Sequence, residues 1–252
     1  MLSKTKNFSF KTDFKRKIKS TNISLARMLK KADLEEGYLI YTDEQTGGVG
    51  QRNTFWESQP RKNLLFSFVI RPNKLELQKQ FYLSIIVSLA LVDLLKKQLP
   101  SSEVKIKWPN DIFVDDRKIA GVLIENAIQG SRFEWVIIGV GLNVNQESFN
   151  IENHYPISLK MILNKGFNRK HLLAEFEVLF AKRYDQLNNE EFEELLSEYL
   201  NIMYRRDQWC TYYSKGIQFQ GTILGIDQYG FLRMETSSGE KTFDVKEVEY
   251  LK

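Results

Sequence analysis

The sequence predicts an α+β fold, in which a mixed β-sheet flanked by helices is followed by a small β-barrel. Apolar strand-like runs alternate with helical segments up to about Met203 of the 252-residue chain. From Trp209 to Leu251 only short alternating strands remain, separated by glycine turns. Mixed structure followed by pure β structure is typical of an α+β domain joined to a small β module. We therefore expect two domains, residues 1–204 and 205–252.

The composition is that of an ordinary soluble globular protein, with 42% hydrophobic and 27% charged residues. A formal net charge of +4 suits anionic ligands but is well below that of a nucleic-acid-binding arm, so we expect no nucleic-acid partner. The single cysteine, Cys210, rules out an intramolecular disulfide, and the two histidines lie too far apart in sequence to suggest a zinc site.

The N-terminus lacks the apolar core of a signal peptide, and the most apolar stretch, Phe81–Leu95, is short for a membrane span and contains Asp93. The expected location is the cytoplasm, without a membrane partner. Residues 1–20 are basic and too poor in apolar residues to form a domain, which leaves no room for a DNA-binding module ahead of the main fold.

The first half of the chain shows helix and strand patterns in turn. Ser20 and Thr21 are candidate N-caps of a helix over about 22–33. The run GYLIYTDE and the run 63–70 are typical of buried strands, and Pro72 ends the second. Apolar residues lie nearly all round the segment 76–97, which predicts a long buried helix.

The next segments predict the rest of the first domain. VKIKW alternates like a strand, and DIFVDDRKIAGVLIEN predicts two strands joined by a tight turn at Asp115 and Asp116. FEWVIIGVGLNVN is typical of a strand that runs into a glycine-bearing turn. Helices are expected over 169–187 and 190–203.

A loop with three closely spaced glycines, TGGVGQRNTFWES, spans Thr46–Ser58. Glycines allow backbone N–H groups to converge on an anion because no Cβ holds the ligand away. Arg52 could add charge, and Trp56 could wall an apolar ligand. From this segment alone, a plain flexible hairpin is an equally good interpretation.

The segment KWPNDIFVDDRKIAG, Lys107–Gly121, combines charges with a Trp-Pro corner. A hairpin here would bring Asp111 and Lys118 together at its open end. A carboxylate for a magnesium ion and an ammonium for a phosphate or carboxylate are what adenylyl transfer from ATP requires. The alternative is an exposed turn with solvated charges, although such a turn does not need a tryptophan.

Two further segments carry weaker signals. In GVGLNVN, Gly139–Asn145, the amide of Asn143 could contact a phosphate or metal, but from this segment alone a bulged strand end is the better interpretation. In the STN run that begins at Ser20, the helix N-terminus could face a ligand in addition to being capped.

Taken together and in this order, these segments resemble biotin–protein ligases. The resemblance is close over about residues 18–145, and KWPNDIFVDDRKIAGVLIE is its most specific motif. It implies the family's catalytic fold, which is similar to that of class II aminoacyl-tRNA synthetases. The terminal β module fits the family's small SH3-like domain, though without a sharp motif.

The resemblance implies a two-step reaction. Biotin's carboxylate attacks the α-phosphate of ATP, which gives biotinyl-5′-AMP and pyrophosphate with Mg²⁺ as the accompanying ion. A lysine of the biotin carrier domain of an acyl-CoA carboxylase, such as acetyl-CoA carboxylase, then attacks the mixed anhydride and releases AMP. No bound prosthetic group is expected.

The resemblance also implies the site residues. Biotin and adenylate contacts fall on Ser20, Thr21, Asn22, Gln45, Gly48, Val49, Gly50, Gln51, Trp56, Gly121 and Asn143. The catalytic groups are Lys118 at the biotin carboxylate and phosphate, Lys107 as a second cation, Arg52 in the loop, and Asp111 in acceptor attack or magnesium binding.

One other function stays open, because a ligase for lipoate or octanoate shares the fold. A biotin-sensing DNA-binding repressor would need a module ahead of Ser20, and we do not expect this function because the basic segment there is too short. A homodimer through the sheet also stays open.

The glycine loop departs from the family's common Gly-Arg-Gly-Arg-Arg-Gly pattern, because it reads Gly48-Val49-Gly50-Gln51-Arg52-Asn53. Less positive charge near the phosphate should hold the adenylate less tightly. We expect the wild type to label non-cognate proteins and Gln51→Arg to label fewer, as measured by streptavidin blotting of a protein mixture. Equal stray labelling by both would refute this.

Overall fold

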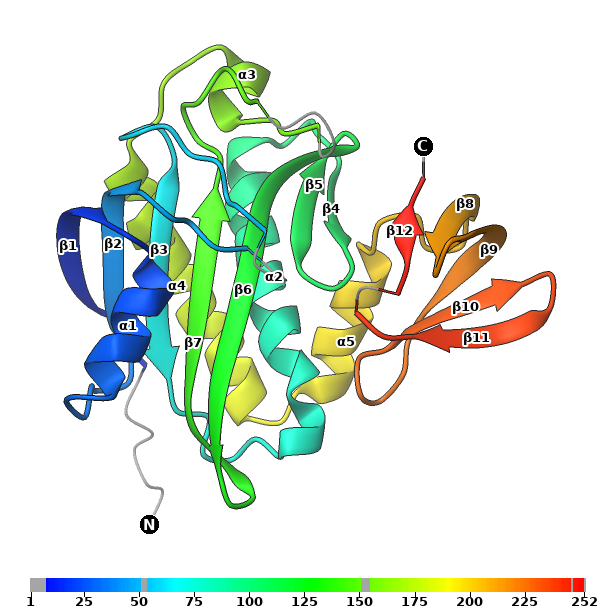
Figure 1. Ribbon diagram of the computed structural model, residues 1–252, viewed down its shortest axis with the longest axis horizontal. Coiled ribbons are helices and arrows are strands. Elements are labelled where there is room, and N and C mark those ends of the chain that lie inside the picture. Colours follow the sequence, from blue (N-terminus) through cyan, green and yellow to red (C-terminus); the bar gives the residue numbers. More distant parts are fainter. Residues whose placement is uncertain (1–7, 51–53, 151–154, 246, 252) are drawn as a thin grey trace.

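The computed structural model describes residues 8–50, 54–150, 155–245 and 247–251. Within these ranges a seven-stranded mixed sheet and a five-stranded antiparallel sheet lie side by side (Figure 1). The predicted α+β architecture with a terminal β module is confirmed.

The large sheet has the strand order β1-β2-β3-β7-β6-β5-β4. Only β1 and β2 run parallel, and α1 crosses between them; every other neighbouring pair is antiparallel. Its strands are β1 (Lys11–Ile18), β2 (Tyr38–Gln45), β3 (Leu64–Ile70), β4 (Val104–Lys107), β5 (Asp111–Val114), β6 (Arg117–Gln129) and β7 (Arg132–Leu142).

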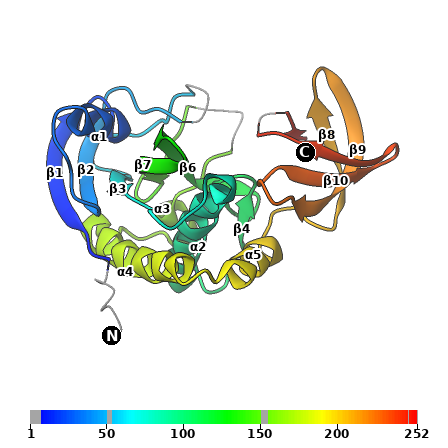
Figure 2. The same cartoon turned by 90° about the horizontal axis from the view of Figure 1, so that it is seen from below.

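Helices cover the two faces of this sheet unequally (Figure 2). The helices are α1 (Thr21–Leu29), a 3₁₀ turn η2 (Leu77–Lys79), α2 (Phe81–Gln98), α3 (Leu159–Leu163), α4 (Arg169–Asn188) and α5 (Phe192–Asn201). On one face, α2 and α4 bury the main core. On the other face, α1 packs Leu25 onto Ile40, Val69 and Ile137. The rest of that second face includes a cavity beside α1, which the segment around Trp56 partly covers.

The long apolar helix α2 lies in the core. With η2 it forms a 22-residue segment, Leu77–Gln98, that is long and apolar enough to cross a membrane by length and composition, as core helices can be. The long buried helix predicted over 76–97 agrees with this segment, although only Phe81–Leu95 was weighed as a membrane span. Eleven of its residues are buried, and α2 contacts α4, α5 and strands β4 to β6.

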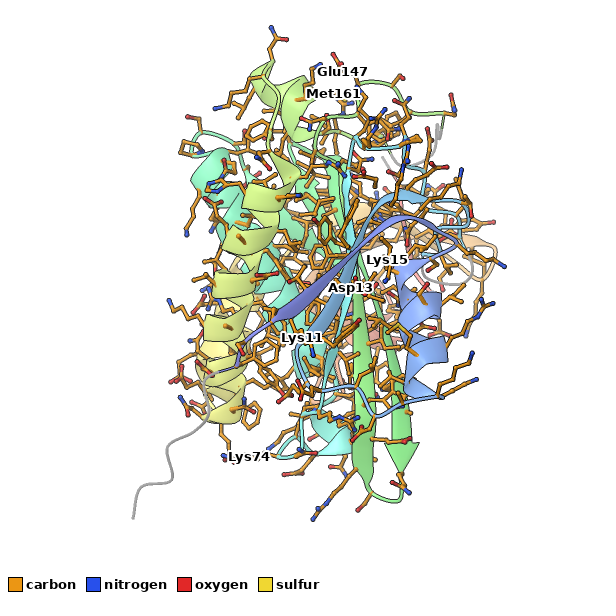
Figure 3. All side chains as sticks on the ribbon, turned by 90° about the vertical axis from the view of Figure 1, so that its left-hand side faces the viewer. Lys11, Asp13, Lys15, Lys74, Glu147 and Met161 are labelled. Atoms are coloured by element: carbon orange, nitrogen blue, oxygen red, sulfur yellow. The ribbon has the colours of Figure 1, made fainter. Side chains whose placement is uncertain are left out.

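The edge strand β1 was not predicted. Its sequence KTDFKRKI is mostly charged and mostly exposed, so it lacks the apolar alternation of a half-buried strand. Charges on an edge strand protect it from pairing with other chains. Figure 3 shows Lys11, Asp13 and Lys15 along this edge.

Two other expectations need correction. The helix expected over 22–33 ends at Leu29. The short helix α3 was missed because its signal is only one turn long; Ser158 caps it by accepting a hydrogen bond from the Met161 N–H at 3.2 Å.

The terminal module contains β8 (Trp209–Ser214), β9 (Ile217–Ile226), β10 (Leu232–Thr236), β11 (Gly239–Phe243) and β12 (Glu249–Tyr250). It is joined to the first domain through a shared core and through Trp108, whose indole Nε1 donates to the carbonyl of Gly230 at 2.9 Å. Gly230 has φ +89°, and a Cβ there would lie 2.2 Å from the Phe81 ring. The turn at Gly230 therefore tolerates no side chain.

The aromatic packing between α4 and the sheet yields a stability prediction. Phe180 is fully buried, with its ring centroid 4.7 Å from that of Phe68. Phe180→Ala should lower the free energy of unfolding by about 3–5 kcal/mol through lost burial and a residual cavity. Val178 on the same helix is 71% exposed, so Val178→Ala should change it by less than about 0.5 kcal/mol. Urea unfolding would measure both, and equal effects would contradict this packing.

Candidate active site

A cavity of about 310 Å³ opens on the same face of the large sheet as α1. Ligand pockets of small-molecule enzymes typically begin at about this size. The cavity gathers segments that are far apart in the sequence. Of the predicted residues, it is lined by Ser20, Thr21, Asn22, Gln45, Val49, Gly50, Trp56, Lys107, Asp111, Lys118, Gly121 and Asn143.

The end of the cavity next to α1 is a hydrogen-bonded polar cluster. The backbone N–H and the hydroxyl of Thr21 donate to Gln45 Oε1 at 2.8 and 3.1 Å. Asn22 Nδ2 donates to Glu125 Oε2 at 2.7 Å. The buried Ser67 hydroxyl lies 2.6 Å from Thr21 Oγ1 and within hydrogen-bond distance of Asn22 Oδ1. These contacts fix the orientation of the Asn22 and Gln45 side-chain amides before a ligand arrives.

Ser20 holds the N-cap position of α1 but not in the predicted way. Its backbone is extended, and its side chain makes no capping hydrogen bond. The residue is buried at 2% exposure and lines the cavity. Its hydroxyl is therefore available to a ligand at the helix N-terminus.

The glycine loop is both a hairpin and a cavity wall. Gly50 N–H donates to the Thr54 carbonyl at 2.7 Å, and Trp56 N–H donates to the Gly48 carbonyl at 3.1 Å. A Cβ on Gly48 would lie 3.2 Å from Gln45 Nε2, so Gly48 borders the polar cluster. The two interpretations of this loop are thus compatible.

The predicted loop residues Gln51 and Arg52 lie outside the described residues.

Two paired glycines form a flat shelf in the middle of the cavity. Gly121 on β6 stands opposite Gly141 on β7. A Cβ on Gly141 would lie 2.4 Å from Trp56 Cε2, and one on Gly121 would lie 3.1 Å from Trp56 Cζ3. The indole therefore rests directly on the backbone of both strands. Its Nε1 is buried and has no hydrogen-bond partner in the described part of the chain, so it can donate to a ligand.

The charged end of the cavity lies beside the shelf. Lys118 Nζ and Asp111 Oδ2 form an ion pair of 2.7 Å, with 20% and 29% of their side chains exposed. Their expected proximity is confirmed. The β5–β6 register shifts between Ile112 and Phe113. Such an irregularity re-aims side chains, and here Lys118 faces the cavity while Ile119 is buried in the core.

Lys107 brings a second ammonium to this end. It stands opposite Asp111 in the β4–β5 pair. Burial lowers the pKa of Lys107; the Asp111 carboxylate opposes this, while Lys118 and Arg205 add to it. An ammonium that has lost its hydration is stabilised strongly by an anion that enters the cavity.

Asn143 lies where β7 leaves the sheet. Its backbone N–H donates to the Ile119 carbonyl at 2.8 Å, and its buried side chain lines the cavity. In the part of the chain that the structure describes, no three His, Cys, Asp or Glu side chains gather as a metal cluster. Asp111 is the carboxylate that lies beside Lys118 in the cavity.

Several site residues were not singled out from the sequence. Ser67 is the one polar residue in the apolar strand LLFSFVI, and that signal could have identified it. Glu125 follows the apolar run IAGVLI within one predicted strand, and a charge at that position could have identified it. Val245, Val248, Glu249 and Tyr250 line the cavity from the terminal module, and nothing in the sequence indicates that they reach it.

The chain matches the model of the biotin/lipoate A/B protein ligase family over residues 14–143. Among curated proteins, it is 30% identical over 244 residues to the bifunctional ligase/repressor BirA of Bacillus subtilis, which covers 91% of this chain and 71% of the relative. It is 34% identical over 130 residues to the biotin–[acetyl-CoA-carboxylase] ligase of Mycobacterium tuberculosis, covering 50% of this chain and 47% of that protein.

Among solved structures, it is similar to the biotin protein ligase of Aquifex aeolicus in complex with biotin and ATP. The TM-score is 0.79 at 23% identity, over 96% of this chain and 98% of that one. That likeness shows the shared fold. The family model covers more than half of the chain and the Bacillus relative nearly all of it, so this protein belongs to the biotin/lipoate A/B protein ligase family.

Proposed function

We propose that this protein is an ATP-dependent biotin–protein ligase, which forms biotinyl-5′-AMP and transfers biotin to a lysine of a carboxylase's carrier domain. One observation carries the proposal: a polar cluster, a glycine shelf and a pair of lysines with a carboxylate share one cavity. The ligase names of the Bacillus and Mycobacterium relatives support it, as does the biotin and ATP complex of the structural neighbour.

The order of these features fits the shape of biotin. Gly139 lies under Asn22, since a Cβ there would be 2.0 Å from Asn22 Oδ1, and Gly141 lies two residues further along β7 under Trp56. Gly141 pairs with Gly121, beside which lie Asp111 and Lys118. The ureido group would meet the fixed amides, the apolar ring would lie against the Trp56 indole that rests on the shelf, and the carboxylate would reach Lys118. Polar groups that fix an otherwise apolar ligand are the usual design of such pockets.

In the first step a carboxylate oxygen attacks the α-phosphorus, a P–O bond forms, and the bond to the departing pyrophosphate breaks. Negative charge gathers on the phosphoryl oxygens, and preorganised cations stabilise it more than water would. Lys118 and Lys107 are those cations. Mg²⁺ supplies further charge neutralisation when it arrives with ATP, and Asp111 is the carboxylate that would hold it.

In the second step the ε-amine of the carrier lysine attacks the carboxyl carbon, and the bond from that carbon to the phosphate oxygen of AMP breaks. The attacking ammonium must first lose a proton. The Asp111 carboxylate would attract that ammonium and accept the proton.

Since ATP is the co-substrate and the acceptor is a carboxylase, we propose a cytoplasmic location, which cell fractionation would test.

Isotope exchange between ATP and pyrophosphate, measured in turn with biotin, lipoate and octanoate, tests which acid is activated. We expect exchange with biotin alone. Label should then pass to a purified carrier domain and not to its variant with arginine in place of the acceptor lysine. Exchange with lipoate or octanoate and none with biotin would assign the protein to the other branch of the family.

Lys118→Met should lower kcat/KM for adenylation about 100-fold, because one fixed cation at the developing charge contributes about 3 kcal/mol. Lys105 is a matched control: it lies on β4, pairs with Glu103 at 3.1 Å and is absent from the cavity lining. Lys105→Met should stay within about twofold of wild type, as surface substitutions usually do. Equal losses in both variants would contradict the role of Lys118.

A further inference from the structure

The terminal β module contributes part of the cavity wall. Val245, Val248, Glu249 and Tyr250 line the same cavity as Asp111 and Lys118. Tyr250 lies on β12, which pairs with β8 at Tyr212. The terminal module therefore lies beside Asp111 and Lys118, although more than a hundred residues of sequence separate it from them.

Lys107 is held by aromatic rings on two sides. Its Nζ lies 4.6 Å from the centroid of the Tyr250 ring and 5.2 Å from that of Phe113. Phe113 belongs to β5 of the first domain and Tyr250 to the terminal module. A cation over an aromatic face is attracted by the ring quadrupole, most strongly where water is excluded.

The two cavity lysines differ in how their charge is held. Lys118 is paired with the Asp111 carboxylate at 2.7 Å. Lys107 has no carboxylate within 4.0 Å in the described ranges, although Asp111 and Glu249 act on it from further away. Neutral rings hold an ammonium in place without cancelling its charge. The charge of Lys107 is thus available to an incoming phosphate.

Tyr250 is firmly placed by its surroundings. Its ring centroid lies 5.3 Å from that of Tyr212 in an edge-to-face contact and 6.1 Å from that of Tyr204. The next residue, Leu251, donates its N–H to the Thr211 carbonyl at 3.2 Å. The Tyr250 hydroxyl is buried and has no partner in the described residues. The contact that Tyr250 makes with the Lys107 ammonium comes from its ring.

We propose that Tyr250 is a positioning residue of the adenylation site, and that its ring holds the Lys107 ammonium toward the phosphates of ATP. The terminal module thereby takes part in ATP binding and in the first chemical step. This inference rests on the proposed function for its choice of nucleotide.

Three variants test it: Tyr250→Leu removes the ring, Tyr250→Phe keeps the ring and removes only the hydroxyl, and Lys107→Met removes the cation. Tyr250→Leu should lower kcat/KM for ATP about tenfold, a size that fits a desolvated cation–ring contact. Tyr250→Phe should keep kcat/KM for ATP within about twofold of the wild-type value, since the ring and its quadrupole remain. The dissociation constant for biotin without ATP should not change.

A double-mutant cycle separates positioning from loss of packing. In the Lys107→Met background, Tyr250→Leu should add less than about a twofold loss, because the interaction is already gone. A tenfold loss in both backgrounds would show that the ring only supports the fold and would overturn the proposal. So would a Tyr250→Phe variant as impaired as Tyr250→Leu.

Calorimetric titration with MgATP in the absence of any acid gives a second measurement. Tyr250→Leu should weaken ATP binding, and Tyr250→Phe should not. This readout does not depend on which acid is activated. Failure of the wild type to exchange with biotin would therefore contradict the proposed function alone, whereas equal ATP affinity of all Tyr250 variants would overturn the role of Tyr250.

Discussion

The close approach of Trp56 to the paired glycines on β6 and β7 is the constraint on which the rest of the site depends. Gly121 and Gly141 stand opposite each other; Gly141 leaves no room for a Cβ beneath the indole, and a Cβ on Gly121 would be a tight fit. The flat surface that results connects the polar cluster at α1 to the charges at Asp111 and Lys118. A side chain at Gly141 would displace the Trp56 indole from this surface, and one at Gly121 would press against it.

The scaffold makes this surface rigid on one side and accessible on the other. The fully buried strand β3 and the buried part of β7 pack against α2 and α4, while α1 covers only part of the opposite face. Catalysis by electrostatic preorganisation needs groups that do not have to move when charge develops. Ion pairing of Lys118, the aromatic contacts of Lys107 and the hydrogen bonds of Asn22 all meet this need before a ligand is bound.

Local patterns in the sequence predicted much of this. The apolar run of α2, the turn at Asp115 and Asp116, and the meeting of Asp111 with Lys118 follow from periodicity and spacing. Both aspartates adopt positive φ, 46° and 64°, as a tight hairpin requires. The charged edge strand β1 did not follow, because exposed strands need no apolar alternation. The register shift that re-aims Lys118 and the arrival of Tyr250 at the cavity depend on tertiary packing, which one sequence does not display.

The central claim is that one ligand spans the cavity from Asn22 to Lys118. A crystal structure of the protein with biotin and a non-hydrolysable ATP analogue tests it most directly. The account predicts the ureido group at the amides of Asn22 and Gln45, the bicyclic ring against the Trp56 indole, and the carboxylate within hydrogen-bond distance of Lys118 Nζ. Biotin bound in the reverse direction, or outside this cavity, would contradict it.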